Sequence, residues 1–330
     1  MATIDAYRAV DDGAGWSDRS ARVRLEVAGP DRAKFLHNLT TNDVKRLAEG
    51  SGQETFVTSP QGKTLAYGSI LACAGSILLR TDPGSLEATL PHLLKYGVFD
   101  DVAIEDATSW TFEYHLAGPR AEALLEAAGI DLPAGPALSH RTTHRDVFPL
   151  RVVRESPTGR PGLTLIGPAE AAPSVRLLLA EGGAAEVDAA TFDALRIEAG
   201  TPISGQDVTA SHLPQEVGRD DRAINFVKGC YLGQETVARL DALGHVNRIL
   251  KGARLEGDAV PPAVGTALEL DGKVVGTITS SAFSTGWGAP VVLATVRVAQ
   301  AGAGTRLALK DGAGVAVVAD LPMVPGGGGG

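Results

Sequence analysis

The sequence predicts an antiparallel α+β protein with a separate all-β domain at its C-terminal end. The expected elements follow one another as strand, helix, strand meander and helix, an order that favours antiparallel sheets over a doubly wound parallel sheet. Helical patterns end near Arg248, and only short strand patterns follow. A chain of 330 residues also exceeds the usual size of one hydrophobic core. We therefore expect an α+β region in residues 1–244, a small β-barrel or sandwich in residues 245–325 and a disordered glycine tail in residues 326–330.

The first half of the α+β region opens with a polar, turn-rich stretch in residues 1–20. Residues 22–27 alternate charged and apolar side chains, which is the period of a half-buried strand. Gly29-Pro30-Asp31 follows as a turn, and Asp31 can cap the next helix. The elements expected after that helix are strands at 54–58, 64–72 and 77–80, a helix at 83–96 and a strand at 102–107.

The second half echoes the first. The turn Gly118-Pro119-Arg120 separates a strand pattern from a helix pattern, as Gly29-Pro30-Asp31 does, and this echo predicts a weak internal repeat. The expected elements are strands at 110–116, 147–153 and 162–167 and helices at 121–128, 169–180 and 189–198.

The C-terminal region contains only strand patterns. Asp271-Gly272 is its sharpest hairpin signal, because both residues tolerate the positive φ angles of a two-residue turn. The strands are expected at 250–255, 267–270, 273–280, 291–298, 306–310 and 315–320.

Composition narrows the classes of function. The net charge of −9 argues against broad nucleic-acid binding, which needs clustered Lys and Arg. The two cysteines, Cys73 and Cys230, are typical of a reducing compartment, and Cys73 lies in an apolar strand pattern that indicates packing. The first residues carry no signal-peptide pattern, and no apolar run approaches the ~20 residues of a membrane span, so a cytoplasmic location is expected.

Common catalytic and metal-binding motifs are absent from the sequence. It has no GxGxxG or Walker pattern after a strand, no GxSxG elbow and no HExxH, so no dedicated metal site is expected. His115, His140 and His144 are interpreted as surface or core residues.

The densest chemistry lies in residues 228–235, Lys-Gly-Cys-Tyr-Leu-Gly-Gln-Glu. Cys230 has two interpretations: it is buried as a small apolar side chain, or it is a reactive thiol. Lys228 and a helix beginning at Gln234 would both favour the thiolate. A second candidate is Glu198, at a helix end beside a Gly stop. Its carboxylate could accept two hydrogen bonds from a pterin, a pyrimidine or a guanidinium, or it could form a solvated ion pair.

Several stretches together resemble the YgfZ-type folate-binding proteins, which are homologues of the glycine-cleavage T-protein, an aminomethyltransferase. The resemblance covers roughly residues 16–300, and the Lys228 to Glu235 run is its most specific part. It implies two ferredoxin-like modules in a ring-like arrangement, a C-terminal β-barrel and tetrahydrofolate in the central opening. The other stretches that carry it are Val27 to Leu36, Thr41 to Val44, Ser59 to Lys63 and Arg196 to Gly200.

The resemblance also assigns roles to single residues. Glu198 matches the glutamate that binds the pterin, and Cys230 matches the signature thiol and is the candidate catalytic residue. Arg239 and Arg248 are added on charge alone, as groups that could orient the motif or attract the glutamyl carboxylates of folate. The folate-binding candidates are Glu198, Lys228, Tyr231, Gln234, Glu235 and Arg239.

One departure bears on the reaction. Where the T-protein has an Asp-Asp pair that supplies its catalytic carboxylate, this sequence has Ala66-Tyr67, and neither side chain can do a carboxylate's work. The resemblance therefore implies a monomeric tetrahydrofolate-binding accessory protein that supports iron–sulfur cluster assembly or repair, with iron–sulfur proteins or their assembly machinery as partners. The alternatives are a folate-dependent aminomethyltransferase or other one-carbon transferase, and a non-catalytic adaptor.

Overall fold

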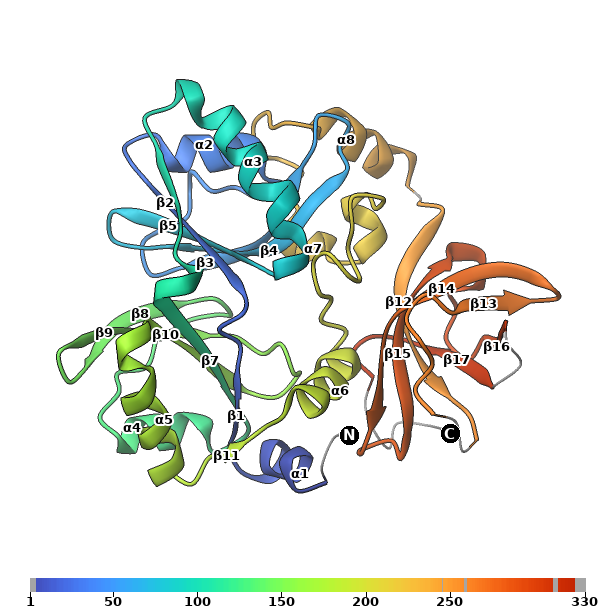
Figure 1. The fold of residues 1–330 in the computed structure, drawn as a ribbon. Helices are drawn as coiled ribbons and strands as arrows, with labels where there is room; N and C mark the ends of the chain where they lie inside the picture. Colours follow the sequence, from blue (N-terminus) through green and yellow to red (C-terminus); the bar gives the residue numbers. More distant parts are fainter. Residues whose placement is uncertain (1–3, 245, 258–259, 311–313, 324–330) are drawn as a thin grey trace.

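The chain builds two α+β modules and a β-barrel. The structure, a computed structural model, describes residues 4–244, 246–257, 260–310 and 314–323. The strands form a five-stranded sheet, a six-stranded sheet and a closed six-stranded barrel, and apart from β1 (Gly15–Asp18) of the six-stranded sheet these follow one another along the chain (Figure 1). The predicted α+β class and C-terminal barrel are confirmed. The glycine tail expected at 326–330 lies outside the described residues.

The first module is an antiparallel sheet with strand order β3-β4-β5-β2-β6, and its core includes apolar side chains of α2 and α3. Its strands are β2 (Val23–Ala28), β3 (Gly52–Thr58), β4 (Thr64–Ala72), β5 (Ser76–Thr81) and β6 (Ala103–Asp106). Its helices are α2 (Arg32–Leu39) and α3 (Leu86–Tyr96).

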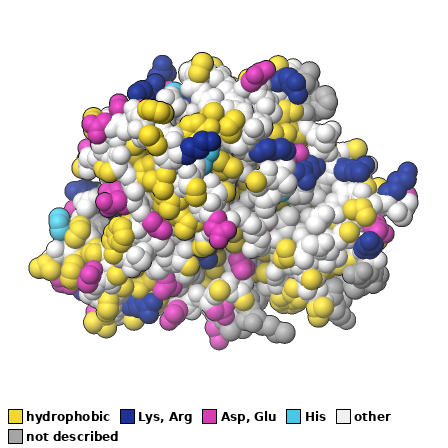
Figure 2. All heavy atoms as spheres, turned by 45° about the horizontal axis from the view of Figure 1, so that its top comes forward, with side chains coloured by type: hydrophobic (Ala, Val, Ile, Leu, Met, Phe, Trp, Pro, Cys, Tyr) yellow, Lys and Arg dark blue, Asp and Glu magenta, His cyan; other side chains and the backbone are white. Residues whose placement is uncertain are grey.

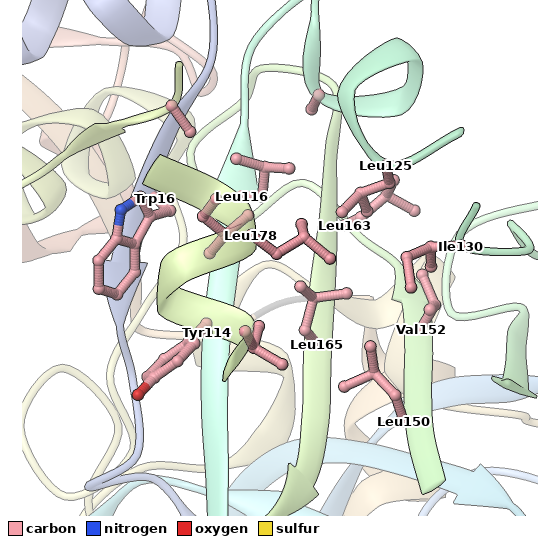
Figure 3. Close-up of a cluster of buried hydrophobic side chains, with 14 of the residues drawn as sticks. Trp16, Tyr114, Leu116, Leu125, Ile130, Leu150, Val152, Leu163, Leu165 and Leu178 are labelled. Atoms are coloured by element: carbon pink, nitrogen blue, oxygen red, sulfur yellow. The ribbon is translucent and has the colours of Figure 1, made fainter. Parts of the chain in front are cut away.

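The second module has strand order β11-β1-β7-β10-β9-β8. Its core packs Tyr114, Leu116 and Leu163 of the sheet against Leu125 of α4 and Leu178 of α5 (Figure 3). The strands are β1 (Gly15–Asp18), β7 (Thr111–Ala117), β8 (His140–Arg145), β9 (Phe148–Arg154), β10 (Gly162–Pro168) and β11 (Ala185–Glu186). The helices are α4 (Ala121–Ala127) and α5 (Ala172–Glu181).

The predicted internal repeat is present. Each module runs strand, helix, three strands, helix, strand, and the strand orders match once β1 is set aside. The two Gly-Pro turns open the first helix of each module, with φ of 100° at Gly29 and 121° at Gly118. A Cβ at Gly29 would lie 2.3 Å from the Asp101 carbonyl oxygen, and one at Gly118 would lie 2.4 Å from that of Gly13. Only glycine is accommodated at either position.

Several elements were not predicted, among them α1, β1 and β8. Residues 1–20 were expected to be turn-rich, but they contain α1 (Ile4–Asp12) and β1. Helix α1 buries Tyr7 and Val10 against Phe192, so tertiary packing stabilises a helix that its polar sequence does not suggest. Strand β8 was missed because most of its side chains are exposed or only partly buried, which removes the apolar alternation.

The barrel closes in the order β12-β15-β14-β13-β16-β17. Asp271 and Gly272 have φ of 51° and 72°, the positive values of a type I′ hairpin turn, as predicted. Helix α6 (Ala189–Ala199) precedes the segment that carries α7 (Asp220–Ala223) and α8 (Gln234–Leu243). The barrel strands are β12 (Arg248–Leu255), β13 (Ala267–Leu270), β14 (Lys273–Ser284), β15 (Ala289–Arg297), β16 (Arg306–Leu309) and β17 (Val315–Ala319).

One face of the molecule carries both signs of charge. On the face that α2, α3 and α8 present, Lys and Arg side chains are interspersed with Asp and Glu (Figure 2). Within the described part of the chain, no helix combines the length and apolar character that a membrane crossing requires.

Candidate functional site

A cavity of about 720 Å³ lies between the two modules. Its walls come from both sheets and from α6, with Glu54, Gly68, His115, Thr164 and Phe192 among the lining residues. The volume falls in the range of about 300–1,000 Å³ that small-molecule sites occupy. The cavity is therefore the candidate ligand-binding site.

A buried ion network ties the modules together beside this cavity. Arg80 of β5 is fully buried, with Nη2 2.8 Å from Glu113 Oε1 and 2.7 Å from Glu155 Oε1. Arg22 bridges Glu113 at 3.2 Å and Asp82 at 3.4 Å. Burial alone would raise the pKa of Glu155, but Arg80 outweighs it and lowers that pKa to about 2. The pKa of Glu113 is lowered in the same way. Both carboxylates are ionised at neutral pH.

Tyr67 lies on the cavity wall beside a carboxylate from the neighbouring strand. Its phenol donates a hydrogen bond of 2.6 Å to Glu54 Oε2. Burial raises the pKa of Tyr67 above its usual range and Glu54 adds to the rise, so the phenol stays protonated. Ala66, by contrast, packs into the core of the first module. Glu54 is thus a cavity carboxylate that sequence reasoning missed.

Two arginines line both the cavity and a smaller, adjoining one of about 380 Å³. Arg219 donates to the Gly200 carbonyl oxygen, and Arg222 lies 3.6 Å from Glu54 Oε1 with its side chain 65% exposed. Arg239, expected to serve this purpose, is exposed on α8, and Arg248 pairs with Glu216 at 3.0 Å. Arg219 and Arg222 are the two cations that an anionic ligand would meet from either cavity.

The motif at 228–235 docks onto the first module, beside the C-terminal end of α2. Lys228 Nζ donates to the carbonyl oxygens of His37 (2.6 Å), Thr40 (2.6 Å) and Asn42 (2.8 Å). Burial lowers the pKa of Lys228 to about 7, while the three carbonyl dipoles favour its protonated form. Lys228 therefore satisfies carbonyl groups that the end of α2 would otherwise leave without partners.

The two glycine turns that carry the resemblance lie against each other. Gly233 has φ of 83°, and a Cβ there would lie 2.4 Å from the Ser59 carbonyl oxygen and 2.8 Å from Gly62 Cα. Thr58 also donates to the Leu232 carbonyl oxygen at 2.7 Å. Glycine is needed at 233 because the two backbones touch.

The predicted site residues of this motif do not line the central cavity. Cys230 is exposed, so the interpretation as a buried side chain is wrong. Tyr231 is half-buried against the core that contains Phe56. The structure brings the residues of the motif together, but it does not place these folate-binding candidates on the cavity wall. The cavity lining omits Lys228, Cys230, Tyr231, Gln234, Glu235 and Arg239.

Glu198 is fully buried, and both of its oxygens accept hydrogen bonds from the chain's own donors. Its two oxygens lie 3.0 and 2.8 Å from the Tyr7 hydroxyl, and they also accept from Arg160 at 3.1 Å and Ser284 at 2.5 Å. The α6 side chains on the cavity wall are Phe192, Arg196 and Ala199, whereas Glu198 is absent from it. The solvated ion pair considered for Glu198 is wrong. Its role as pterin ligand stays a prediction, and in this arrangement both of its oxygens already have partners within the chain.

Comparisons with known proteins agree with the architecture. The family model described as the GCVT N-terminal domain matches residues 1–228. The chain is 33% identical to a putative chloroplastic transferase of Arabidopsis thaliana, over 84% of this chain and 63% of that protein, so it spans less than two thirds of this relative. It is 31% identical to an aminomethyltransferase of Rubrobacter xylanophilus, over 88% of this chain and 78% of that protein.

Among solved structures, the chain is similar to the glycine cleavage system aminomethyltransferase T of Bartonella henselae. The TM-score is 0.86 at 22% sequence identity, covering 98% of this chain and 89% of the other. The shared fold confirms the expected arrangement of two modules and a barrel.

Proposed function

Because the chain belongs to the GCVT N-terminal domain family, we propose that it binds tetrahydrofolate in the cavity between its two modules. The observation that supports this most directly is a cavity of about 720 Å³ that Arg219 and Arg222 line, where their guanidinium groups can bind an anionic ligand. Folate ends in glutamyl carboxylates, which guanidinium groups bind through charge-assisted hydrogen bonds. Tetrahydrofolate would supply a carrier for one-carbon units, and Arg219 and Arg222 would hold its anionic end.

Calorimetric titration with tetrahydrofolate tests this proposal. Replacing both Arg219 and Arg222 with Gln is expected to weaken binding by at least about tenfold, because each hydrogen bond to a charged group contributes about 1.5–3 kcal/mol. Arg239→Gln, which removes an exposed arginine of α8, serves as the control and should leave the affinity unchanged. Equal affinities for the double variant and wild type would contradict the role of the two arginines. No binding by wild type would contradict the function itself.

We further propose a YgfZ-type role for this chain, in which Cys230 supports assembly or repair of iron–sulfur clusters. Cys230 is exposed, and it follows Phe226 and Val227, whose exposed fractions are 42% and 91%. Exposed apolar side chains beside a thiol are suited to contact with a client protein or with assembly machinery.

The Cys230→Ala variant is expected to fold and to bind tetrahydrofolate as wild type does, because the exposed Sγ supports no buried contact. It should nevertheless fail to restore iron–sulfur enzyme activity in a strain that lacks the native protein. Cys73→Ala is the matched control, since Cys73 is buried, and it should still restore activity wherever it folds. Full rescue by Cys230→Ala would rule out the thiol role.

A second candidate function is folate-dependent one-carbon transfer. Glu54 favours it, because this carboxylate lies on the cavity wall within hydrogen-bonding distance of Tyr67. It could supply the negative charge that Ala66 and Tyr67 lack. Turnover of an aminomethyl or methylamine donor in the presence of tetrahydrofolate would favour this candidate over the accessory role.

A further inference from the structure

Three residues that line the cavity carry a buried polar atom without a hydrogen-bond partner among the described residues. They are Gln53 (Nε2), Arg19 (Nε) and His115 (Nε2), the last only 2% exposed. Two of the three, Arg19 and His115, lie beside one aromatic ring. Phe192 contacts both side chains: the Arg19 guanidinium lies 4.1 Å over its ring, and the His115 ring meets it edge-on with centroids 6.2 Å apart. Buried polar groups are normally paired, so two neighbouring exceptions on a cavity wall indicate a place for ligand atoms.

The hydrogen-bond chain behind His115 determines its tautomer. Thr164 Oγ1 lies 2.5 Å from Glu155 Oε1, and that carboxylate is ionised, so the hydroxyl must donate its only proton to it. His115 Nδ1 lies 2.9 Å from the same hydroxyl oxygen, which can now only accept. Nδ1 therefore carries the ring proton. Burial lowers the pKa of His115 to about 4, so the ring is neutral at pH 7 and Nε2 presents a lone pair.

Arg19 offers the opposite hydrogen-bonding character. A guanidinium carries five N–H donors and no acceptor, and it keeps its charge at all physiological pH values. Stacking on Phe192 fixes the plane of the group. The two residues that contact Phe192 thus offer a donor on Arg19 and an acceptor on His115.

We propose that Arg19 and His115 form a subsite for the lactam edge of a planar heterocycle, in which a ring N–H lies beside a C=O. The carbonyl oxygen accepts from Arg19, and the ring N–H donates to His115 Nε2. A carboxylate does not match, because it would face the lone pair of Nε2, and an ammonium group does not match, because it would face Arg19. Reduced pterins carry such an edge. Identifying the heterocycle as the pterin of tetrahydrofolate rests on the proposed function, whereas the pairing of donor and acceptor follows from these side chains alone.

The subsite differs from the one that the resemblance implies. The acidic residue expected to bind the pterin is Glu198, whose oxygens are already occupied by Tyr7, Arg160 and Ser284. In this chain a neutral histidine and an arginine take over recognition of the ring edge. The ring would then lie near Phe192, with the glutamyl end directed to Arg219 and Arg222.

Titrations with two fragments of folate test the subsite separately from the whole ligand. The first, 6-methyltetrahydropterin, has the lactam edge but no glutamate, and the second, p-aminobenzoylglutamate, has the glutamate but no lactam. His115→Phe keeps a buried ring and removes the acceptor. It should weaken binding of 6-methyltetrahydropterin about tenfold, the effect of one neutral hydrogen bond with its partner left unpaired, and leave p-aminobenzoylglutamate unchanged.

His140→Phe is the matched control. His140 is 5% exposed and also has an Nε2 without a partner among the described residues, but it does not line the cavity, so this variant should bind both fragments as wild type does. Nitrogen NMR provides a direct readout: His115 should show a protonated Nδ1 and a bare Nε2, and only the Nε2 signal should move strongly when 6-methyltetrahydropterin is added. Arg19→Met replaces His115→Phe if the latter fails to fold.

The outcomes separate the two proposals. Wild-type affinity of a folded His115→Phe variant for 6-methyltetrahydropterin overturns the subsite, even if tetrahydrofolate binds to the wild-type protein. Binding of 6-methyltetrahydropterin but not of tetrahydrofolate to wild type supports the subsite and overturns the proposed function. A wild-type protein that binds neither the pterin fragment nor tetrahydrofolate overturns both.

Discussion

Replacing Arg80 with methionine is expected to lower the free energy of unfolding by about 3–5 kcal/mol, the usual cost of removing one partner from a buried ion pair. Arg80 is fully buried and bridges Glu113 and Glu155, whose side chains are 1% and 14% exposed. Without the guanidinium, Glu155 loses this ion-pair partner, and Glu113 keeps only Arg22 and Arg24 beside it. Urea-induced unfolding measures the loss.

Arg306→Met is the control for this prediction. Arg306 pairs with Glu256 on the surface, with side chains 59% and 36% exposed, and the variant should lose less than about 1 kcal/mol. Similar losses for the two variants would show that the Arg80 network does not hold the modules together.

The same network makes stability depend on pH. The folded-state pKa of Glu155, about 2, lies below the value of about 4.3 for an unperturbed glutamate, so the unfolded state takes up protons first as the pH falls. The contribution is complete above about pH 4.3 and is lost between there and about pH 2. In the Arg80→Met protein this acid-dependent loss should shrink, and an unchanged pH profile would contradict the assignment.

Lys228→Met is expected to cost about 3 kcal/mol, because it leaves three buried carbonyl groups at the end of α2 without their donor. Amide hydrogen exchange should accelerate at the end of α2 and in residues 228–235, since the lysine joins these segments. The effect on stability is measured by denaturant unfolding.

Lys34→Met provides a comparison on the same helix. The Lys34 side chain is 54% exposed and pairs with Asp100 at 2.9 Å, so its removal should change the stability far less than Lys228→Met and leave exchange near residue 228 unaltered. If Lys228→Met were equally mild, the motif would owe its position to the glycine contacts at 62 and 233 instead.

Local signals in the sequence predicted much of the fold. Gly29 and Gly118 mark equivalent turns, because both have a positive φ and both lie against the backbone of another segment. The repeat is therefore visible in the sequence as the same Gly-Pro pair at both turns. Asp271-Gly272 determines its hairpin through two residues alone. Such features depend on neighbours in the chain and can be read without knowing the tertiary structure.

The candidate site depends on pairings that no local pattern contains. Glu54 meets Tyr67 only because β3 and β4 pair with Phe56 opposite Tyr67. His115 was interpreted as a surface or core residue, and its burial on a cavity wall is what makes it a candidate ligand contact. Glu198 shows the converse. Its residue type suits a pterin, but Tyr7, 191 positions away, occupies its oxygens.

Strand β1 has a consequence for how the protein is made. It lies between β11 and β7, in a sheet whose other strands all come from residues 111–186. During synthesis β1 leaves the ribosome roughly 90 residues before β7, which at about 5–20 residues per second is a wait of about 5–20 seconds without its sheet partners. The first module can complete its own sheet during that interval. The second module needs β1 as well as residues 111–186. A fragment that begins at residue 111 lacks β1, so β11 and β7 would have to pair directly, without the strand that lies between them.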